Sequence, residues 1–214
     1  TAQDHKRVGE GDVGKNTGGM GCYSPSRLFN KELAKKINEK IINPTLKAIE
    51  SLGTTYKGFL YVGLMIKGDN PYLVEFNVRM GDPECQTILP LLENDLIEII
   101  DDCCQGELKK EGIKLNNKKS ICIVLCSKGY PENYKKNVQI NGLDNLILKE
   151  NQFIFHAGTK LAKNNILAYG GRVLNFVSLA NNFKDSRNDI IKLINQLNWK
   201  NGFYRKDIGH KVID

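Results

Sequence analysis

The sequence lacks long hydrophobic runs. No apolar stretch in its 214 residues approaches the roughly 18 consecutive residues that a transmembrane helix needs. The opening residues, TAQDHKRVGEG, also lack the basic-then-apolar pattern of a secretory signal peptide. We therefore expect a cytoplasmic protein with no membrane partner.

The sequence also lacks the paired cysteines of a metal or redox motif. None of its six cysteines forms a C-x-x-C, and none has the paired spacing and histidine partner of a zinc site. Cys122 and Cys126 share one apolar run, where they would face the same side of a strand but lie too far along it for a disulfide. We expect reduced, buried thiols. The six are Cys22, Cys85, Cys103, Cys104, Cys122 and Cys126.

Basic residues are numerous but not clustered. Lys and Arg number 31 against 24 Asp and Glu, which gives a net charge of +7, yet no basic run exceeds two residues. Aromatic residues are not interleaved with them, as they are on many nucleic-acid surfaces. We therefore expect small phosphate-bearing substrates rather than nucleic acid as partners.

No standard nucleotide-binding motif is present. Residues 18–21, GGMG, have neither the lysine–serine end of a P-loop nor the G-x-G-x-x-G spacing. Such a cluster allows backbone N–H groups to close on an anionic ligand, although a simple turn gives the same pattern. Asp4, Lys6 and Arg7 bring a carboxylate and two cations into one short segment, which is equally typical of an exposed charged loop.

The most informative stretch is residues 72–84, YLVEFNVRMGDPE. Its alternation predicts a strand over residues 72–79, with one apolar face directed into a core. The residues of that apolar face are Val74, Phe76 and Val78. The other face would then be entirely polar, because side chains alternate along a strand.

The polar face of this strand has the chemistry of a metal–nucleotide site. Glu75 and Asn77 place two oxygen donors at i and i+2, which can share a hard cation such as Mg²⁺. Arg79, two residues further on, suits phosphate oxygens. A solvated face or a cross-strand ion pair would use the same residue types.

Residues 81–84 predict a turn that leads into a helix. Asp82 suits the N-cap, and Pro83 suits the first helical position. The free N–H groups of this helix start would lie beside the cation, where anions bind well.

Helical and strand patterns follow one another along the first half. A helix over residues 31–52 would be capped by Asn30 and split by Pro44. The apolar run over residues 58–66 predicts a central strand covered on both faces, paired with residues 72–79 in an antiparallel hairpin. A second helix is expected from Asp95, capped by Asn94.

The second half predicts mostly strands. These cover residues 120–126, 153–159 and 173–179, and an amphipathic helix covers residues 185–197. His156 lies between apolar neighbours, which is typical of a core histidine. Arg172 follows two glycines, where it would either support the turn or meet a phosphate.

Six ordered segments together resemble glycinamide ribonucleotide synthetase, also called phosphoribosylamine–glycine ligase, an ATP-grasp family of purine synthesis. The segments are QDHKRVGEGDVGKNTGGMGCYSP, GFLYVGLMI, VEFNVRMGDPE, FHAGT, GGRVL and YRKDIG. The resemblance implies an ATP-dependent carbon–nitrogen ligase. Such an enzyme joins glycine to 5-phosphoribosylamine through a glycyl phosphate, and gives glycinamide ribonucleotide, ADP and phosphate.

The resemblance also implies a set of site residues. Glu75 and Asn77 match the family's divalent-metal positions, which would hold Mg²⁺ or Mn²⁺, with ATP as co-substrate. Arg79 and Asp82 match positions expected to act in catalysis, Arg79 through phosphate or carboxylate oxygens. The implied substrate- and phosphate-binding residues are Asp4, Lys6, Arg7, Asn16, Gly18, Gly19, Met20, Gly21, Pro83 and Glu84.

The family's chain is roughly twice this length, as expected for three or four packed domains. We therefore expect an α+β fold that is only the C-terminal half of such an enzyme. Residues 1–106 would be the later part of an ATP-grasp core, an antiparallel sheet with helices. Residues 107–214 would be a smaller β-rich C-terminal domain with one helix. The start at Thr1 fits a fragment or a processed chain, which would be inactive without its N-terminal part.

Two alternatives remain open at this point. Another ATP-grasp carboxylate–amine ligase would share Glu75 and Asn77 but not the DHKR and NTGGMG segments. A basic module that binds RNA or polyphosphate would instead show salt-sensitive affinity set by several phosphate contacts.

Overall fold

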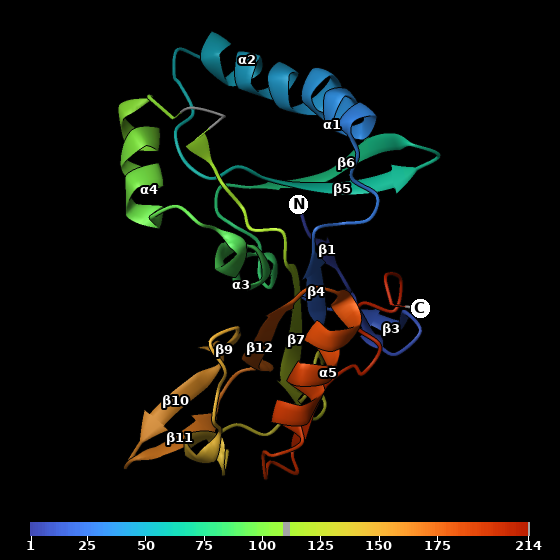
Figure 1. The fold of residues 1–214 in the computed structure, drawn as a ribbon, viewed down its shortest axis with the longest axis vertical. Coiled ribbons are helices and arrows are strands. Elements are labelled where there is room, and N and C mark those ends of the chain that lie inside the picture. The colour runs from blue at the N-terminus through green and yellow to red at the C-terminus, as the bar shows by residue number, and fades with distance from the viewer. Residues whose placement is uncertain (109–111, 214) are drawn as a thin grey trace. The chain divides into compact units, whose positions relative to one another are not determined.

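Figure 1 shows the computed structural model, which describes residues 1–108 and 112–213. Its elements belong to two compact units whose segments alternate along the chain. The first unit comprises Thr1–Ser26, Asp82–Leu91 and Asn117–Asp214, and the second comprises Arg27–Gly81 and Leu92–Asn116. The predicted domain boundary after residue 106 lies inside the second unit. The compact units are therefore a different division of the chain, and the predicted domains stay a prediction.

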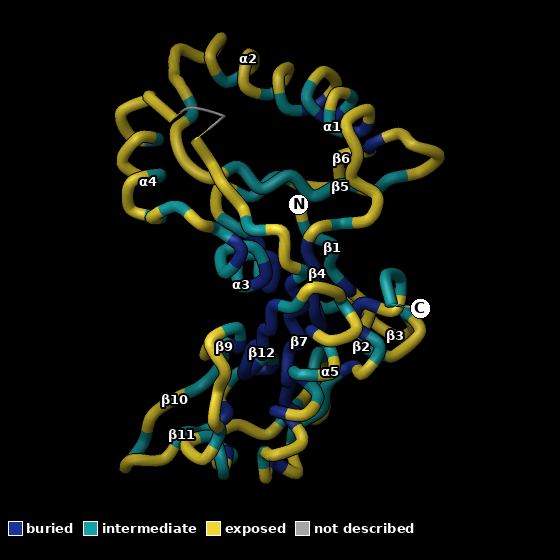
Figure 2. Tube along the Cα trace, in the orientation of Figure 1, coloured by how far each residue is buried: buried dark blue, intermediate teal, exposed yellow. Residues whose placement is uncertain are grey.

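The first unit is built on a six-stranded antiparallel sheet. Its strand order is β1–β4–β7–β12–β9, and the short strand β13 also pairs with β7. The two central strands, β7 and β12, are buried along nearly their whole length, as the dark blue trace of Figure 2 shows. The strands are β1 (Gln3–Asp4), β4 (Gly21–Ser24), β7 (Lys119–Ser127), β9 (Gln152–His156), β12 (Arg172–Ala180) and β13 (Gly202–Phe203).

One long helix packs on this sheet. α5 (Phe183–Ile194) begins where the Asn182 side chain accepts a hydrogen bond from the Asp185 N–H at 2.8 Å. Its apolar stripe, which includes Ile190 and Leu193, is buried against β7 and β12. The predicted helix over residues 185–197 is therefore confirmed, although it lies two to three residues earlier.

The other elements of the first unit are short. They are the hairpin β2 (Arg7–Gly9) and β3 (Val13–Asn16), the sheet of β8 (Val138–Gln139), β10 (Thr159–Ala162) and β11 (Asn165–Ala168), the helix α3 (Glu84–Ile88), and 3₁₀ turns at Leu89–Leu91 and Leu143–Asn145.

The second unit begins with a helix that changes its pitch. Asn30 caps α1 (Lys31–Ile37), as predicted, because its side chain accepts a hydrogen bond from the Leu33 N–H at 2.8 Å. A π-helical turn over Asn38–Ile42 then leads into α2 (Asn43–Ser51). The helical run is thus unbroken from residue 31 to residue 51 but changes from α to π and back, and Pro44 lies in the first turn of α2.

The remainder of the second unit is the hairpin of β5 (Tyr61–Lys67) and β6 (Asn70–Asn77), followed by α4 (Leu96–Gln105). The antiparallel hairpin is confirmed. The cap of α4 is Asp95, whose carboxylate accepts from the Ile97 N–H at 2.7 Å, so the prediction of Asn94 was wrong by one residue.

The predicted burial of this hairpin was wrong. Val74 and Val78 are 65% and 78% exposed, and Met65 on β5 is 62% exposed. A β-bulge explains part of the difference, because Gly63 pairs with Glu75 but Leu64 pairs with Leu73, which leaves Val74 without a partner. Among the described residues this sheet consists of two strands, so β5 is not the central, doubly covered strand that the apolar run suggested.

Other predictions near strands and thiols also need correction. The strand predicted over residues 153–159 ends at His156, which is exposed rather than part of the core, and the His156 Nδ1 lies 2.9 Å from Thr159 Oγ1. All six cysteines are free, as predicted, but only Cys22, Cys122 and Cys126 are buried; Cys85 and Cys103 are partly buried and Cys104 is exposed. Every helix in the described part of the chain is too short or too polar to span a bilayer.

Candidate functional site

The N-terminal edge of the first unit holds a buried carboxylate. Asp4 lies on β1, and its Oδ1 accepts a hydrogen bond from the His5 N–H at 2.7 Å. Its Oδ2 forms an ion pair with Lys6 Nζ at 2.6 Å. Its side chain is only 8% exposed. Burial raises the pKa of Asp4 to about 6; the Lys6 cation opposes this rise, and the nearby Glu84 adds to it. Asp4 and Lys6, both predicted site residues, thus form one ion pair.

Residues 17–21 (TGGMG), called the glycine segment below, pack directly on this carboxylate. Gly19 has a φ of 124°, and a Cβ there would lie 2.5 Å from Pro83 Cδ and 2.8 Å from Asp4 Oδ1. Only glycine fits such a position. The structure therefore brings together three residues that the sequence analysis selected from distant segments: Asp4, Gly19 and Pro83.

A methyl group at position 19 is expected to destabilise this arrangement. Gly19→Ala should lower the free energy of unfolding by at least about 2 kcal/mol, because it adds backbone strain and a clash with Pro83. Gly53→Ala is the control, since Gly53 also has a positive φ (82°) but open space around it. Urea denaturation of both variants measures the difference, and equal losses would contradict a tight contact at Gly19.

The amides of the glycine segment are occupied within the chain. The Thr17 and Met20 N–H groups bind the Lys6 and His5 carbonyls at 2.7 and 2.9 Å. The Gly18 and Gly19 N–H groups bind hydroxyls instead, of Tyr130 and Thr17, both at 3.0 Å. An anion would therefore have to meet this segment at its hydroxyl groups or displace them.

Five of the predicted substrate-binding residues are buried: Gly19, Met20, Gly21, Pro83 and Glu84. The side chain of Met20 is fully buried in the core, where its Sδ lies 3.8 Å from Cys126 Sγ. Gly21 lies on β4 beside the Cys122 carbonyl, and Glu84 is 6% exposed. Met20 is thus a packing residue, because its side chain has no path to a ligand and its backbone N–H and carbonyl are both hydrogen-bonded.

Asp82 does not cap α3, contrary to prediction. Its carboxylate binds Arg172, with Nη2 3.0 Å from Oδ2, and its carbonyl accepts from Arg172 Nη1 at 2.7 Å. Gln86 also donates to Asp82 Oδ1 at 3.0 Å. The N-cap position is Pro83, which makes no side-chain cap. α3 is also too short, at five residues, to act as an anion site.

The sequence left two roles open for Arg172, support of the turn or contact with a phosphate. Besides Asp82, its Nη1 donates to the Gly18 carbonyl at 3.0 Å. A Cβ on Gly18 would lie 2.8 Å from the guanidinium carbon, so this approach depends on glycine. Arg172 therefore ties the glycine segment to the start of α3; in the sequence it was marked by its place after two glycines and by the GGRVL segment of the resemblance.

Arg7 and Asn16 face each other across the β2–β3 hairpin. The Arg7 side chain is exposed, and its Nη1 donates to the Gly14 carbonyl at 2.8 Å. Together with Lys6, whose side chain is 47% exposed, Arg7 gives this edge two cations that solvent can reach.

The predicted metal residues lie in the second unit. Glu75 and Asn77 end β6, two residues apart and beyond the bulge, so they share one face of the hairpin. In the described ranges neither side chain has a hydrogen bond or an ion pair, which leaves both oxygen donors available. A carboxylate and an amide fit a hard divalent cation, with phosphate and water oxygens to complete its six ligands. The described residues contain no cluster of three or more Asp, Glu, His or Cys that could hold a metal unaided.

Arg79 lies beyond the end of β6, so it does not continue the alternation of the strand as predicted. Its side chain is exposed, and its Nη1 donates to the Met80 carbonyl at 2.8 Å. Arg79, Glu75 and Asn77 thus belong to the second unit, whereas the other predicted site residues belong to the first.

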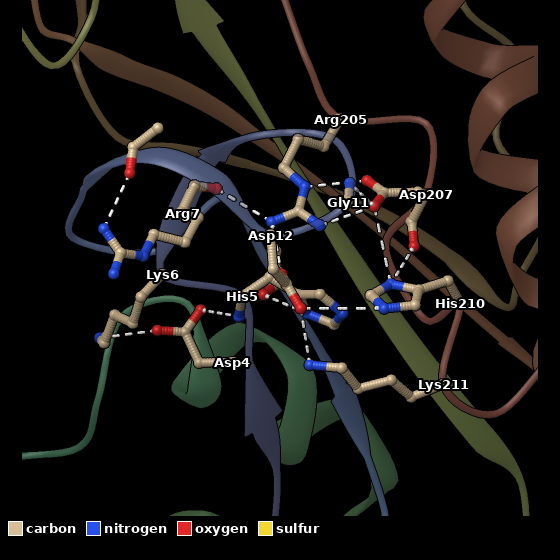
Figure 3. A network of polar contacts seen from close by, with 12 residues as sticks. Asp4, His5, Lys6, Arg7, Gly11, Asp12, Arg205, Asp207, His210 and Lys211 are labelled. Atoms are coloured by element: carbon tan, nitrogen blue, oxygen red, sulfur yellow. Dashed lines mark hydrogen bonds and ion pairs between the residues drawn. The ribbon is translucent and has the colours of Figure 1, made fainter.

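The C-terminal segment contacts the β2–β3 hairpin of the first unit, next to Asp4 and Lys6 (Figure 3). Arg205 is 1% exposed and binds Asp207 through two hydrogen bonds, of 2.8 and 2.7 Å. Its Nη1 also donates to Asp12 Oδ1 at 3.0 Å and to the Arg7 carbonyl at 2.9 Å. The YRKDIG segment therefore fixes the backbone beside Lys6 and Arg7, a role that sequence analysis did not assign.

The fold belongs to the ATP-grasp class. A biotin carboxylase subunit of pyruvate carboxylase superposes with a TM-score of 0.61 over 94% of this chain and 42% of its own, at 14% identity. A phosphoribosylamine–glycine ligase from Thermotoga maritima superposes with a TM-score of 0.84 at 32% identity, over 96% of this chain and 50% of its own.

Two family models match the chain in sequence. The ATP-grasp (A) domain of phosphoribosylglycinamide synthetase matches residues 1–85, and the C domain matches residues 120–211. This chain belongs to the phosphoribosylglycinamide synthetase family. Phosphoribosylamine–glycine ligases of Caldanaerobacter subterraneus and Arabidopsis thaliana are each 42% identical, over 97% and 100% of this chain and 49% and 41% of their own lengths. The chain thus spans about half the length of the relatives it matches.

Proposed function

We propose that this chain is the C-terminal half of a phosphoribosylamine–glycine ligase. The reaction begins when a glycine carboxylate oxygen attacks the γ-phosphorus of ATP, which gives glycyl phosphate and ADP. The amine of 5-phosphoribosylamine then attacks the acyl carbon and expels phosphate, with release of a proton. The observation that carries the proposal is that both family domains match in order and that the two metal positions, Glu75 and Asn77, are present and unengaged.

The protein supplies positions and charges rather than a nucleophile. Glu75 and Asn77 would hold Mg²⁺ (or Mn²⁺), which when bound offsets negative charge on the phosphates of ATP. Arg79 would contact transferring oxygens from the second unit. In the first unit, Lys6 and Arg7 suit a phosphate monoester, and the Asp82–Arg172 pair holds the glycine segment in place. Six free thiols suit a cytoplasmic location.

A test of this proposal joins the chain to its missing half. The joined protein, defined here as the N-terminal half of the Caldanaerobacter relative followed by this chain, should form glycinamide ribonucleotide from glycine, ATP and phosphoribosylamine. The isolated chain should show no turnover, because the ATP-covering lid and the adenine contacts are expected in the other half. Turnover by the isolated chain at the rate of the joined protein would refute the half-enzyme proposal. A joined protein that melts cooperatively yet makes no product would refute the activity.

Loss of a single metal donor should be visible in the metal dependence of the joined protein. Glu75→Gln is expected to weaken the apparent Mg²⁺ affinity by about 100-fold or more, since weaker perturbations of metal sites cost 10–100-fold. Glu98→Gln, a matched change on the exposed surface of α4 in the same unit, should leave it unchanged. The apparent Mg²⁺ affinity is read from the midpoint of the reaction rate across a Mg²⁺ titration. Equal midpoints for the two variants would show that Glu75 is not a metal ligand.

A further inference from the structure

The turn that follows β7, residues 129–134 (GYPENY), docks on the N-terminal edge of the same unit. The Tyr130 hydroxyl accepts the Gly18 N–H at 3.0 Å, and Glu132 forms an ion pair with Lys15 on β3. Gly171 makes room for this docking, because a Cβ there would lie 2.2 Å from the Tyr130 ring. Two contacts thus connect the turn with the segment that precedes β4, more than 100 residues away in sequence.

Both backbone polar groups of Gly18 are hydrogen-bonded to side chains. Tyr130 binds its N–H, and Arg172 binds its carbonyl at 3.0 Å. Arg172 already uses three of its five N–H groups, two on Asp82 and one on Gly18. Tyr130 differs, because a phenol that accepts one hydrogen bond can still donate its own proton. Among the described residues that proton has no acceptor.

The surroundings of Gly18 favour an anionic acceptor. Gly18 is exposed, and the preceding Thr17 binds the Lys6 carbonyl through both its N–H and its hydroxyl, at 2.7 and 2.9 Å. Lys6, whose carbonyl Thr17 binds, lies between β1 and β2, and Arg7 begins β2; solvent can reach both cations. A hydroxyl donor, together with two cations on the neighbouring segment, is a suitable set for phosphate oxygens.

We propose that Tyr130 is a substrate-binding residue that holds Gly18 through its oxygen and donates its proton to the phosphoribosyl substrate. The identity of that substrate rests on the proposed function. This assigns a binding role to the turn over residues 129–134. The neighbouring Tyr134 provides contrast: its ring lies 6.5 Å from that of Tyr130, also packs near Gly171, and in the described ranges its hydroxyl makes no hydrogen bond.

The test is a titration of the isolated chain with ribose 5-phosphate, a stable ligand that lacks the reactive amine. Binding is followed by the NMR shift of the Gly18 amide. Tyr130→Phe keeps the packing of the ring and is expected to bind about tenfold more weakly. Tyr134→Phe is the matched control and should bind as the wild type does. In the joined protein, Tyr130→Phe should raise KM for phosphoribosylamine by a similar factor and leave KM for ATP unchanged.

Each other outcome overturns the inference. The inference fails if the wild-type chain does not bind ribose 5-phosphate, if Tyr130→Phe binds it equally well, or if Tyr134→Phe loses the same affinity. A rise in KM for ATP alone would also overturn it. The titration needs no turnover, so an inactive joined protein would count against the proposed reaction and leave the binding result to be judged separately.

Discussion

Arg205→Met is expected to lower the free energy of unfolding of this chain by about 3–5 kcal/mol, the usual loss when one partner of a buried ion pair is removed. Arg205 is 1% exposed and donates to two carboxylates and one backbone carbonyl. Methionine fills a similar volume but leaves Asp207 without its two guanidinium hydrogen bonds. Because the network ties residue 205 to residues 7 and 12, its loss also frees the N-terminal edge.

The measurement is urea denaturation followed by the fluorescence of Trp199, which is the single tryptophan of the chain and is buried. Lys206→Met is the matched control, because Lys206 is the exposed neighbour and should change stability by less than about 0.5 kcal/mol. Arg205→Lys should recover only part of the loss, since an ammonium group cannot bind Asp207 through the same planar fork. A loss below 1 kcal/mol for Arg205→Met would mean that the network is not structural.

The second large effect is on the pH dependence of stability. The pKa of His5 is lowered and that of its neighbour Asp4 is raised, so their contributions to the free energy of unfolding change in opposite directions with pH. Burial and, to a lesser extent, the Arg205 cation lower the pKa of His5 to about 4. The ring nitrogens lie 3.3 Å from the Gly21 carbonyl and the Gly209 N–H, an arrangement that suits the neutral ring, with one nitrogen donating and one accepting. His5 thus contributes stability above its unfolded pKa near 6.5, and that stability is lost as the pH falls towards 4.

The contribution of Asp4 to stability changes in the opposite direction over nearly the same pH range. Its folded pKa of about 6 exceeds its unfolded value of 3.8, so its protonated form is favoured by folding. Its contribution is fully present below pH 3.8 and is lost as the pH rises through 6. Each shift of about two units or slightly more corresponds to roughly 3 kcal/mol. The two effects therefore nearly cancel in the wild-type chain between pH 6.5 and 4.

Single substitutions should separate the two titrations. Asp4→Asn removes the opposing group, so its unfolding free energy should fall by about 3 kcal/mol between pH 6.5 and 4. His5→Asn should instead gain a similar amount over that interval. Denaturation at a series of pH values gives the slopes, which do not depend on the absolute stability of either variant. Parallel pH profiles for the wild type and both variants would show that neither group titrates as its burial requires.

Sequence patterns predicted those parts of the fold whose causes are local. The Asn30 cap, the β5–β6 hairpin and α5 follow from short-range spacing and turn chemistry, and each is present. The exposed face of β6 was missed because a bulge at Val74 leaves no signal in the alternation of residue types. Asp82 looked like a helix cap for equally local reasons.

The candidate site depended on contacts that no local pattern contains. Arg172 reaches Asp82 across 90 residues of sequence, and Tyr130 reaches Gly18 across 112. Such pairings arise from the order of strands in the sheet, which places the ends of β12 and β7 beside the N-terminal segment. Sequence analysis could select Gly18 and Asp82 by motif, but it could not identify Arg172 as the residue that holds both.

The alternation of segments between the two compact units has a consequence for dissecting the protein. The chain is divided into five successive segments, so it passes from one unit to the other four times. No single stretch of gene therefore encodes either unit by itself, and truncation at either of the two inner passages removes strands or helices from both. Limited proteolysis at one passage should likewise leave the cleaved pieces associated, and excising one unit for separate study would require rejoining its segments with artificial linkers.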